Sequence, residues 1–444
     1  MKDSYLQNMK TLLKEDYESY LKSLQNPPVR GIQVNLHKGS VKNFLEKTEL
    51  ILEKIPYTEN GFILIENTKM GKDPLYKAGA YYGQEPSSMI PISAISIKEG
   101  SLVLDLCASP GGKSIDILNA LNETGFLVSN EYNTKRANIL LSNLEKTGFS
   151  NFMITNLDIL SLSKLYQGVF DVVVLDSPCS GEGMFRKDEK AQNVWHEDLP
   201  YKCQQRSLEL IELAKKLVKQ NGILVYSTCT FNRQENEEVI KKALEDNYFI
   251  QLKATDKIIQ VTKEGYPFTK TRRFYPHLAK GEGQVVSILK RTAENTSLPF
   301  KSSLKNLSKK DEGIVQEFIK ANLTTFPLQI FKYHDSIIAL PNNLLNIPDY
   351  KVLRIGVKLG EIKNERFIPH HHFFISLSHL FIRKINFNKN DDNLKKYLRG
   401  EEIQNIDISN GYGVIEIEGY SLGGFKAVNH TLKNYYPKGL RDIS

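Results

Sequence analysis

Between residues 100 and 290, short apolar runs alternate with segments of helical periodicity, and this alternation limits the possible folds more than any other feature of the chain. Such runs are typical of strands buried on both faces of a sheet. Strands that alternate with helices form a parallel sheet covered by helices on both faces. The predicted fold class is therefore α/β with a doubly wound, Rossmann-like core, and a barrel is the alternative. Strands are expected at 103–106, 126–131, 152–157, 170–175, 223–227 and 284–290, and helices at 114–121, 134–147, 205–219 and 233–244.

Smaller units are expected on both sides of this core. A chain of 444 residues is too long for one hydrophobic core. We expect a small N-terminal α+β domain at 1–95, with helices at 1–25 and 41–55 and strands at 31–35 and 61–65. The core domain should span 96–292, and a polar stretch at 291–308 reads as a linker. An intermediate domain at 305–380 and a final domain at 385–444 follow.

The composition argues against several classes of protein. No apolar run approaches the ~20 residues of a membrane span, and the N-terminus lacks the apolar centre of an export signal. The four cysteines lie far apart without a C-x-x-C motif, so neither a disulfide framework nor a zinc site is indicated. We expect a cytoplasmic protein with reduced thiols. The net charge of +8 favours a polyanionic partner.

A glycine turn follows the first expected strand, in the sequence Leu-Asp-Leu-Cys-Ala-Ser-Pro-Gly-Gly-Lys-Ser at 104–114. Backbone N–H groups and a helix N-terminus then face the crevice at the strand ends. A P-loop would require glycine where the chain has Cys107, and the dinucleotide pattern G-x-G-x-x-G is absent. The ligand that remains is a nucleoside without phosphates, and S-adenosylmethionine (SAM) has this chemistry.

Acidic residues at the ends of the next two strands complete the expected cofactor site. Glu131 stands where such folds carry the acid that binds the ribose hydroxyls. Asp158 is the expected partner of the adenine amino group. The alternative is that these carboxylates only cap helices. The predicted SAM-binding residues are Cys107, Ala108, Ser109, Pro110, Gly111, Gly112, Lys113, Glu131, Arg136, Asp158 and Asp176.

Two cysteines follow the ends of strands that this topology places side by side. Cys179 lies three residues after Asp176, and Cys229 follows the strand at 223–227. A thiolate that adds to carbon 6 of cytosine makes carbon 5 nucleophilic toward the SAM methyl group. A second group must then remove the carbon 5 proton, and a carboxylic acid near ring N3 would stabilise the developing charge. The spacing does not tell which thiol attacks. Cys203 is expected to be only a small buried side chain.

Three motifs in this order resemble the Sun/nucleolar-protein family of RNA cytosine-carbon-5 methyltransferases. They are Cys-Ala-Ser-Pro-Gly-Gly-Lys at 107–113, Asp-Ser-Pro-Cys-Ser-Gly-Glu-Gly at 176–183 and Ser-Thr-Cys-Thr at 227–230. The resemblance implies that Cys229 is the nucleophile, that Cys179 helps to resolve the adduct and that Asp176 belongs to the catalytic group. DNA cytosine methyltransferases instead attack with the Pro-Cys thiol. The family usually has alanine where this chain has Ser177.

The tail at 419–441 resembles the bacterial ribosomal small-subunit methyltransferase F branch of that family. This resemblance implies a PUA-like RNA-binding region at 385–444. We also expect an RNA-recognition role for the N-terminal domain at 1–95. Basic side chains hold phosphates and aromatic rings stack on bases, although by composition alone a solvated tail is equally consistent. The predicted RNA contacts are Arg186, Lys426, Lys433, Tyr435, Tyr436, Lys438 and Arg441.

The histidines at 370–372 invite a metal interpretation, but in a strand they would point to alternate faces, so we expect no metal. The leading hypothesis is SAM-dependent methylation of cytosine carbon 5 in RNA. The expected substrate is small-subunit 16S ribosomal RNA, naked or in the assembled subunit, and the expected state is a monomer. One alternative keeps the chemistry and moves the target to tRNA. The other is a non-catalytic, RNA-binding ribosome-assembly factor.

Overall fold

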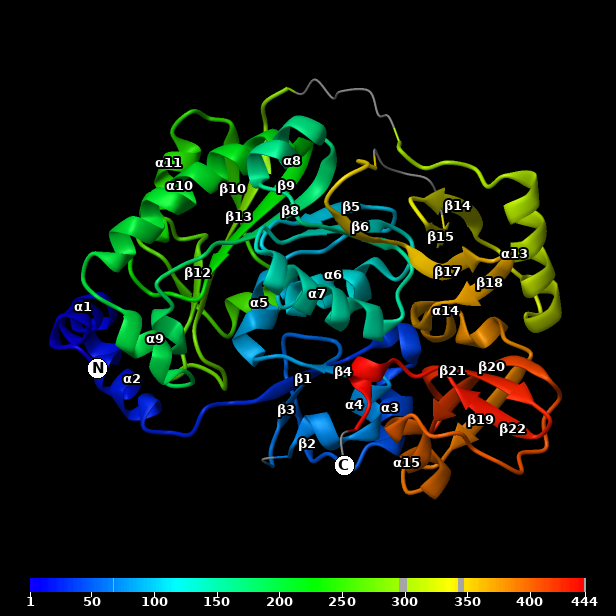
Figure 1. The fold of residues 1–444 in the computed structure, drawn as a ribbon. Helices are drawn as coiled ribbons and strands as arrows, with labels where there is room; N and C mark the ends of the chain where they lie inside the picture. Colours follow the sequence, from blue (N-terminus) through cyan, green and yellow to red (C-terminus); the bar gives the residue numbers. More distant parts are fainter. Residues whose placement is uncertain (67, 295–301, 342–346, 443–444) are drawn as a thin grey trace.

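The computed structural model describes residues 1–66, 68–294, 302–341 and 347–442, which form four β-sheets (Figure 1). Part of the expected linker, residues 295–301, lies outside the described residues. One large sheet carries the site, and three four-stranded sheets accompany it. Within the described ranges, no helix combines the length and the apolar character needed to cross a membrane.

The large sheet confirms the predicted α/β class. Its central strands are parallel in the order β9-β8-β5-β6-β7, and antiparallel strands beginning with β13 extend it beyond β9. Apolar side chains of these strands are buried on both faces, as the continuous apolar runs predict. The bounds are β5 Leu102–Asp105, β6 Phe126–Asn130, β7 Phe152–Thr155, β8 Phe170–Asp176, β9 Val218–Thr228, β10 Phe249–Leu252, β11 Lys263–Glu264, β12 Arg272–Phe274 and β13 Gln284–Arg291.

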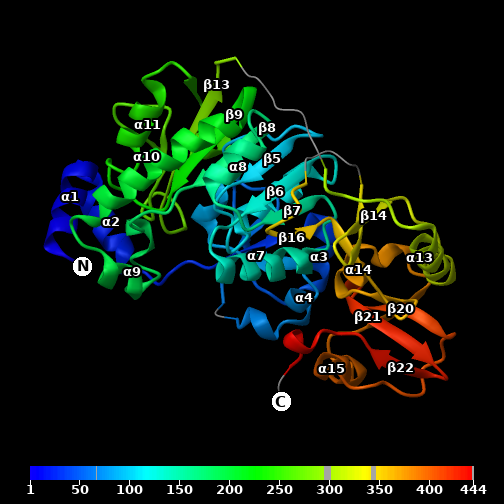
Figure 2. The same ribbon diagram turned by 45° about the horizontal axis from the view of Figure 1, so that its top comes forward.

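Helices cover both faces of this sheet (Figure 2). Residues of α5, α6 and α7 join the core on one face, and residues of α8, α10 and α11 join it on the other. Helix α10 begins six residues before the expected position 205, and Pro200 fits its first turn because no backbone N–H is needed there. The bounds are α5 Ile90–Ser93, α6 Gly112–Leu121, α7 Thr134–Thr147, α8 Ile159–Leu165, α9 Glu189–Val194, α10 Leu199–Leu217, α11 Glu237–Leu244 and α12 Asp256–Ile259.

The expected single helix at 1–25 is wrong, because a 3-10 turn divides it into α1 (Asp3–Leu13) and α2 (Tyr17–Leu24). Lys14, at this break, has a positive φ of 50°. The two helices lie beside α9 (Figure 1). The Tyr5 ring contacts Phe185 and Trp195 with centroid distances of 4.8 and 5.9 Å. The N-terminal segment therefore covers the chain that follows Cys179.

The first small sheet has the order β2-β3-β1-β4. The helix expected at 41–55 ends at Lys47, because Leu52 and its neighbours pair with β3 instead. Pairing with a neighbouring strand here overrides the helical spacing of the apolar residues. The bounds are β1 Gly31–Val34, α3 Val41–Lys47, β2 Leu52–Lys54, β3 Gly61–Leu64, α4 Pro74–Lys77 and β4 Tyr81–Gly83.

The stretch after the linker contributes to two sheets. Strand β16 (Val352–Ile355) pairs antiparallel with β7 and forms the far edge of the large sheet. The other strands form the sheet β14-β15-β17-β18. The bounds are α13 Lys309–Asn322, β14 Gln329–Tyr333, β15 Ser336–Leu340, β17 Val357–Lys363 and β18 Arg366–Pro369.

The three histidines were expected in a strand. The structure instead places them at the start of α14 (His371–Ser376). His370 caps this helix by accepting a hydrogen bond from the His372 N–H. Their side chains are shielded from solvent or partly so, and burial lowers the pKa of His371 to about 3. Across the described part of the chain, no group of three or more His, Cys, Asp or Glu side chains is arranged to hold a metal ion.

The last sheet shares a core with the first small sheet, although the two lie at opposite ends of the sequence (Figures 1 and 2). Ile32 and Phe44 belong to the same buried cluster as Ile415 and Tyr420. Lys47 also donates to the Glu418 carbonyl at 2.6 Å. The bounds are β19 Arg383–Phe387, α15 Asp392–Arg399, β20 Gly411–Ile417, β21 Tyr420–Val428 and β22 Thr431–Asn434.

Candidate active site

Neighbouring strands β8 and β9 bring the two cysteine loops together. They run parallel with Asp176 opposite Ser227, so the loops that follow leave the same edge of the sheet. The Cys179 and Cys229 sulfur atoms lie 3.3 Å apart. Their hydrogen bond, followed by burial, raises the pKa of the Cys179 thiol well above its usual value. The Cys179 thiol therefore keeps its proton.

Glycine allows the two loops to approach so closely. The Gly183 N–H donates to the Cys229 carbonyl at 2.9 Å. A Cβ at Gly183 would lie 2.9 Å from that same carbonyl oxygen and 2.8 Å from the Gly283 Cα. Gly181 turns the loop with a positive φ of 72°, a conformation that costs glycine little. Any side chain at Gly183 would therefore push the two cysteine loops apart.

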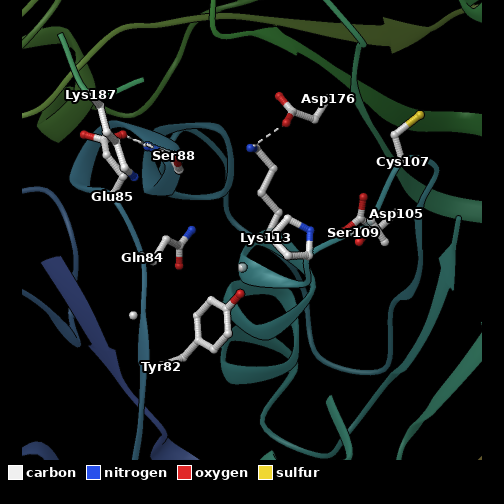
Figure 3. Close-up of a pocket in the computed structure, with 14 residues that line it drawn as sticks. Tyr82, Gln84, Glu85, Ser88, Asp105, Cys107, Ser109, Lys113, Asp176 and Lys187 are labelled. Carbon is white, nitrogen blue, oxygen red and sulfur yellow. Dashed lines mark hydrogen bonds and ion pairs between the residues drawn. The ribbon is translucent and has the colours of Figure 1, made fainter. Parts of the chain in front are cut away.

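Three donors hold the Asp176 carboxylate beside the thiols. Lys113 donates to Oδ2 at 2.7 Å (Figure 3). Ser227 and Gln284 donate to Oδ1 at 2.6 and 3.3 Å. Burial alone would lower the pKa of Lys113, but the adjacent Asp176 carboxylate outweighs it and the pKa is raised. The sequence predicted the position of Asp176 at the strand end. It did not predict Gln284, which arrives from antiparallel β13.

Ser177 differs from the alanine that the resembled family usually carries, and the structure gives its hydroxyl a partner. The Ser177 and Ser207 hydroxyls lie 2.7 Å apart in the interior. Because Ser207 belongs to α10, this contact joins the strand end to the helix behind it. The extra hydroxyl therefore points away from the cleft and into a satisfied hydrogen bond.

A pocket lies between the glycine loop and the segment that enters the large domain (Figure 3). Tyr82, Gln84 and Glu85 line one side, and the loop residues line the other. Sequence reasoning missed this first group, since nothing in its spacing indicated that it folds back over the loop. The glycine-loop and strand-end residues at the pocket are Asp105, Cys107, Ala108, Ser109, Pro110, Gly112, Lys113 and Asp176.

Four family models match successive parts of the chain. The model described as 16S rRNA methyltransferase RsmB/F matches residues 92–290, and the N-terminal domain of 16S rRNA methyltransferase RsmF matches 1–86. The RsmF rRNA methyltransferase first C-terminal domain matches 317–377, and the methyltransferase RsmF PUA domain matches 384–442.

Relatives of full length give the same result. Ribosomal RNA small subunit methyltransferase F from Pectobacterium atrosepticum is 30% identical over 392 residues, covering 81% of this chain and 79% of that protein. The chain belongs to this family. The protein of the same name from Aeromonas salmonicida is 27% identical over 451 residues, covering 95% of this chain and 93% of its own. The predicted resemblance is thereby confirmed.

Solved structures support the same fold. A methyltransferase homologue from Pyrococcus horikoshii is 25% identical with a TM-score of 0.55, covering 66% of this chain and 95% of its own. NSun6 from Pyrococcus horikoshii, solved with SFG, is 19% identical with a TM-score of 0.58 and covers 66% of this chain and 99% of its own. The core is that of a SAM-dependent methyltransferase, and the family uses SAM as its cofactor.

Glu131 follows β6 and is not among the residues that line the pocket, but it carries a buried polar atom that suits SAM. Glu131 is 5% exposed, and its Oε1 accepts from the Asn133 N–H. Its Oε2 is buried without a hydrogen bond, 3.4 Å from the Arg136 guanidinium. A carboxylate oxygen that lacks a donor at this strand end suits a ribose hydroxyl. Burial also raises the pKa of the adjacent Cys107 thiol to about 12, so that side chain is neutral.

Asp158 caps the helix that follows its strand. Its Oδ1 accepts from the Ser161 N–H at 2.8 Å and its Oδ2 from the Ser161 hydroxyl at 2.7 Å. These hydrogen bonds, the one from the Ser161 hydroxyl first, lower the pKa of Asp158. These contacts agree with the alternative interpretation, a helix cap, and the adenine contact of Asp158 stays a prediction.

Two of the predicted RNA contacts are enclosed by the protein. The Arg186 side chain is 5% exposed and pairs with Glu282 at 2.9 Å, so it has no free face for a phosphate. Tyr436 is 4% exposed and packs at 5.5 Å from the Tyr397 ring, so it offers no face to a base. Both assignments are corrected: these residues hold the fold together.

The other predicted RNA contacts reach the surface to different degrees. Lys433 and Lys438 are exposed, whereas Lys426 lies 5.2 Å from the centre of the Tyr412 ring. Tyr435 packs against Tyr412 at 5.4 Å. Arg441 donates to the Tyr436 carbonyl at 3.1 Å. Lys433 and Lys438 are therefore the two of this set with the most freedom to contact RNA.

Proposed function

We propose that this chain methylates carbon 5 of a cytosine in 16S ribosomal RNA through a covalent bond between Cys229 and carbon 6. The observation that carries the proposal is the pair of thiols 3.3 Å apart beside the Asp176 carboxylate and the SAM pocket. Methylation of an amino group or an oxygen needs no thiol, whereas carbon 5 chemistry uses a nucleophile and a second group.

Each residue has a defined task in this mechanism. The Cys229 thiolate forms the bond to carbon 6, and the electron pair of the 5,6 double bond moves to carbon 5. When bound, SAM supplies the methyl group that carbon 5 acquires. The carbon 5 proton then leaves to a base, its electron pair restores the double bond, and the Cys229 thiolate is expelled. With a proton held between its carboxyl group and ring N3, Asp176 stabilises the negative charge that develops at that edge of the ring.

The state of Cys179 supports its role in the last step. Its thiol is protonated, since the hydrogen bond to Cys229 and burial raise its pKa. A protonated thiol 3.3 Å from the leaving sulfur can donate to the thiolate as that bond breaks. A protonated thiol is also a poor nucleophile, which argues against Cys179 as the attacking group.

The RNA target follows from the family and from the C-terminal region. The relatives are named ribosomal RNA small subunit methyltransferases, and a PUA domain model matches 384–442. The net charge of +8 favours a polyanion. The target cytosine must be unpaired or flipped out for carbon 6 to be reached.

We further propose a division into domains at 1–95, 96–292, 305–380 and 385–444, the first and last contacting RNA. The enzyme is proposed to act as a monomer in the cytoplasm. The scattered cysteines support that location.

The test uses the wild-type protein and the Cys179→Ala and Cys229→Ala variants, each incubated with SAM and RNA and then run on a denaturing protein gel. We expect Cys179→Ala to accumulate a slowly migrating RNA adduct and Cys229→Ala to form none. An adduct that requires Cys179 would reverse the two roles. Parallel reactions contain naked 16S RNA, assembled small subunits and tRNA, and 5-methylcytosine formed only on tRNA would overturn the ribosomal target.

A further inference from the structure

Each cysteine loop supplies a buried glutamate to the other. Glu182 lies three residues after Cys179, and its side chain is directed at the loop that follows Cys229. Its Oε2 accepts from the backbone N–H groups of Phe231 and Asn232 at 3.0 and 2.8 Å. Glu182 is 3% exposed, so water does not compete for these hydrogen bonds.

Glu235 makes the reciprocal connection. It follows Cys229 by six residues and is fully buried. Its Oε2 accepts from the backbone N–H of Ser180 at 2.9 Å, and its Oε1 accepts from the Ser180 hydroxyl. Ser180 is the residue directly after Cys179. Glu235 therefore holds the chain immediately beside one thiol, while Glu182 holds the chain just beyond the other.

Asn232 connects the two carboxylates. Its side-chain amide donates to Glu235 Oε1 at 2.6 Å and to Glu182 Oε1 at 3.1 Å. The Trp195 indole N–H, 3.3 Å away, also donates to Glu182 Oε1. Every oxygen of both glutamates thus faces donors. A carboxylate meets this demand on both oxygens, whereas a glutamine would turn its NH₂ group toward another N–H or O–H.

We propose that Glu182 and Glu235 are positioning residues that hold the two thiols at the distance and orientation that the reaction needs. Glu182 acts on Cys229, and Glu235 acts on Cys179. The inference rests on the proposed two-thiol mechanism and adds two residues to it. Neither glutamate reaches the substrate in this role. Each acts through the loop of the opposite cysteine.

The crossed arrangement predicts that the two residues affect different steps. Loss of the Glu235 contacts frees Ser180 and with it Cys179, so expulsion of Cys229 from the adduct should slow. Loss of the Glu182 contacts frees the chain after Cys229, so formation of the adduct should slow. A purely structural role would lower both steps together, in proportion to the loss of folded protein.

The experiment compares Glu235→Gln and Glu182→Gln with the wild type, using SAM and a 16S RNA transcript that carries no modification. Covalent RNA–protein adduct is quantified on denaturing gels, and 5-methylcytosine by mass spectrometry. A buried donor left without its acceptor costs roughly 1–3 kcal/mol, so we expect changes of about tenfold or more. Glu235→Gln should raise the ratio of adduct to released product, and Glu182→Gln should lower the rate of adduct formation without raising that ratio.

Two further variants keep the result interpretable. Glu145→Gln removes a half-buried carboxylate that pairs with Arg354 at 2.9 Å, on α7 and away from the thiols. It should lower thermal stability and leave the ratio of adduct to product unchanged. Ser180→Ala removes one hydrogen bond to Glu235 but does not place one donor group against another. It should therefore raise the ratio of adduct to product by less than Glu235→Gln does. It replaces Glu235→Gln if that variant does not fold.

The outcomes separate this inference from the proposed function. If Cys179→Ala accumulates adduct while Glu235→Gln and Ser180→Ala keep the wild-type ratio, the positioning role of Glu235 is wrong and the mechanism stands. If both glutamine variants lose adduct and product in parallel with stability, the two glutamates are only structural. If Cys179→Ala accumulates no adduct on any RNA, the two-thiol mechanism itself fails.

Discussion

Lys113 donates a hydrogen bond of 2.7 Å to Asp176 and so links the glycine loop to the end of the strand that leads to Cys179. The two residues are 63 positions apart in the sequence. The ammonium compensates a carboxylate that would otherwise be costly to enclose, and it fixes which oxygen faces the cleft. The carboxylate that we propose to be catalytic is therefore oriented by the same loop that we propose to bind the cofactor.

Replacing Asp176 with asparagine should lower kcat by about 10²–10³-fold, the range seen when one preorganised group that stabilises transition-state charge is removed. The amide cannot carry the charge that Lys113 compensates. SAM affinity, measured by calorimetry, should change much less than kcat. Asp171→Asn is the matched control, since Asp171 lies on the same strand but accepts from the Leu102 N–H at the other end of the sheet. Equal losses in both variants would contradict a catalytic role for Asp176.

Local patterns predicted the central sheet and the thiol pair, because both depend on short-range rules. Apolar runs mark strands buried on both faces, and parallel strands place their carboxyl ends at one edge. Gln84 and Gln284 could not be predicted in this way. Each reaches the site through long-range packing, which leaves no periodic signal in the sequence.

The errors have the same origin. Arg186 was expected to contact RNA because it follows the active loop. It is instead paired with Glu282, which lies 96 residues away in the sequence. Tyr436 looked like a stacking platform in a basic tail, but the Tyr397 ring covers it. The helix expected at 41–55 was cut short because Leu52 found a strand partner in Leu64. In each case a tertiary contact overrode a local preference.

Glu131→Gln should weaken SAM binding by about tenfold, because a carboxylate–hydroxyl hydrogen bond is worth roughly 1.5–3 kcal/mol and the amide retains only part of it. Calorimetric titration of SAM into the RNA-free enzyme measures the change. Asp158→Asn provides the contrast. If Asp158 only caps α8, this variant should leave SAM affinity and stability near their wild-type values, because asparagine caps a helix about as well as aspartate. A loss of SAM affinity in Asp158→Asn would instead support the adenine role.

Lys433→Glu and Lys438→Glu should weaken RNA binding and make it less dependent on salt. Each phosphate contact that is lost lowers the slope of log K against log salt concentration by about 1. At saturating RNA the kcat should remain unchanged, because both lysines lie in the final sheet region, far along the chain from the thiols. Lys320→Glu, an exposed lysine on α13, is the control. An equal effect in that variant would mean that net charge alone sets the affinity.

Asp105→Asn should flatten the dependence of stability on pH between about 4 and 7. Burial raises the pKa of Asp105 to about 7, against roughly 3.9 when the chain is unfolded. The folded protein thus binds a proton that the unfolded chain releases across this window, so wild-type stability falls as the pH rises through it, by up to about 1.4 kcal/mol per pH unit for this group. Urea unfolding at several pH values measures the slope.

Glu361→Gln is the control of opposite sign. Hydrogen bonds from Lys358 and Lys363 lower the pKa of Glu361 to about 2, so its contribution is lost only in acid and the slope above pH 5 should be unaffected. An unchanged slope in Asp105→Asn would show that Asp105 is already ionised in the folded protein.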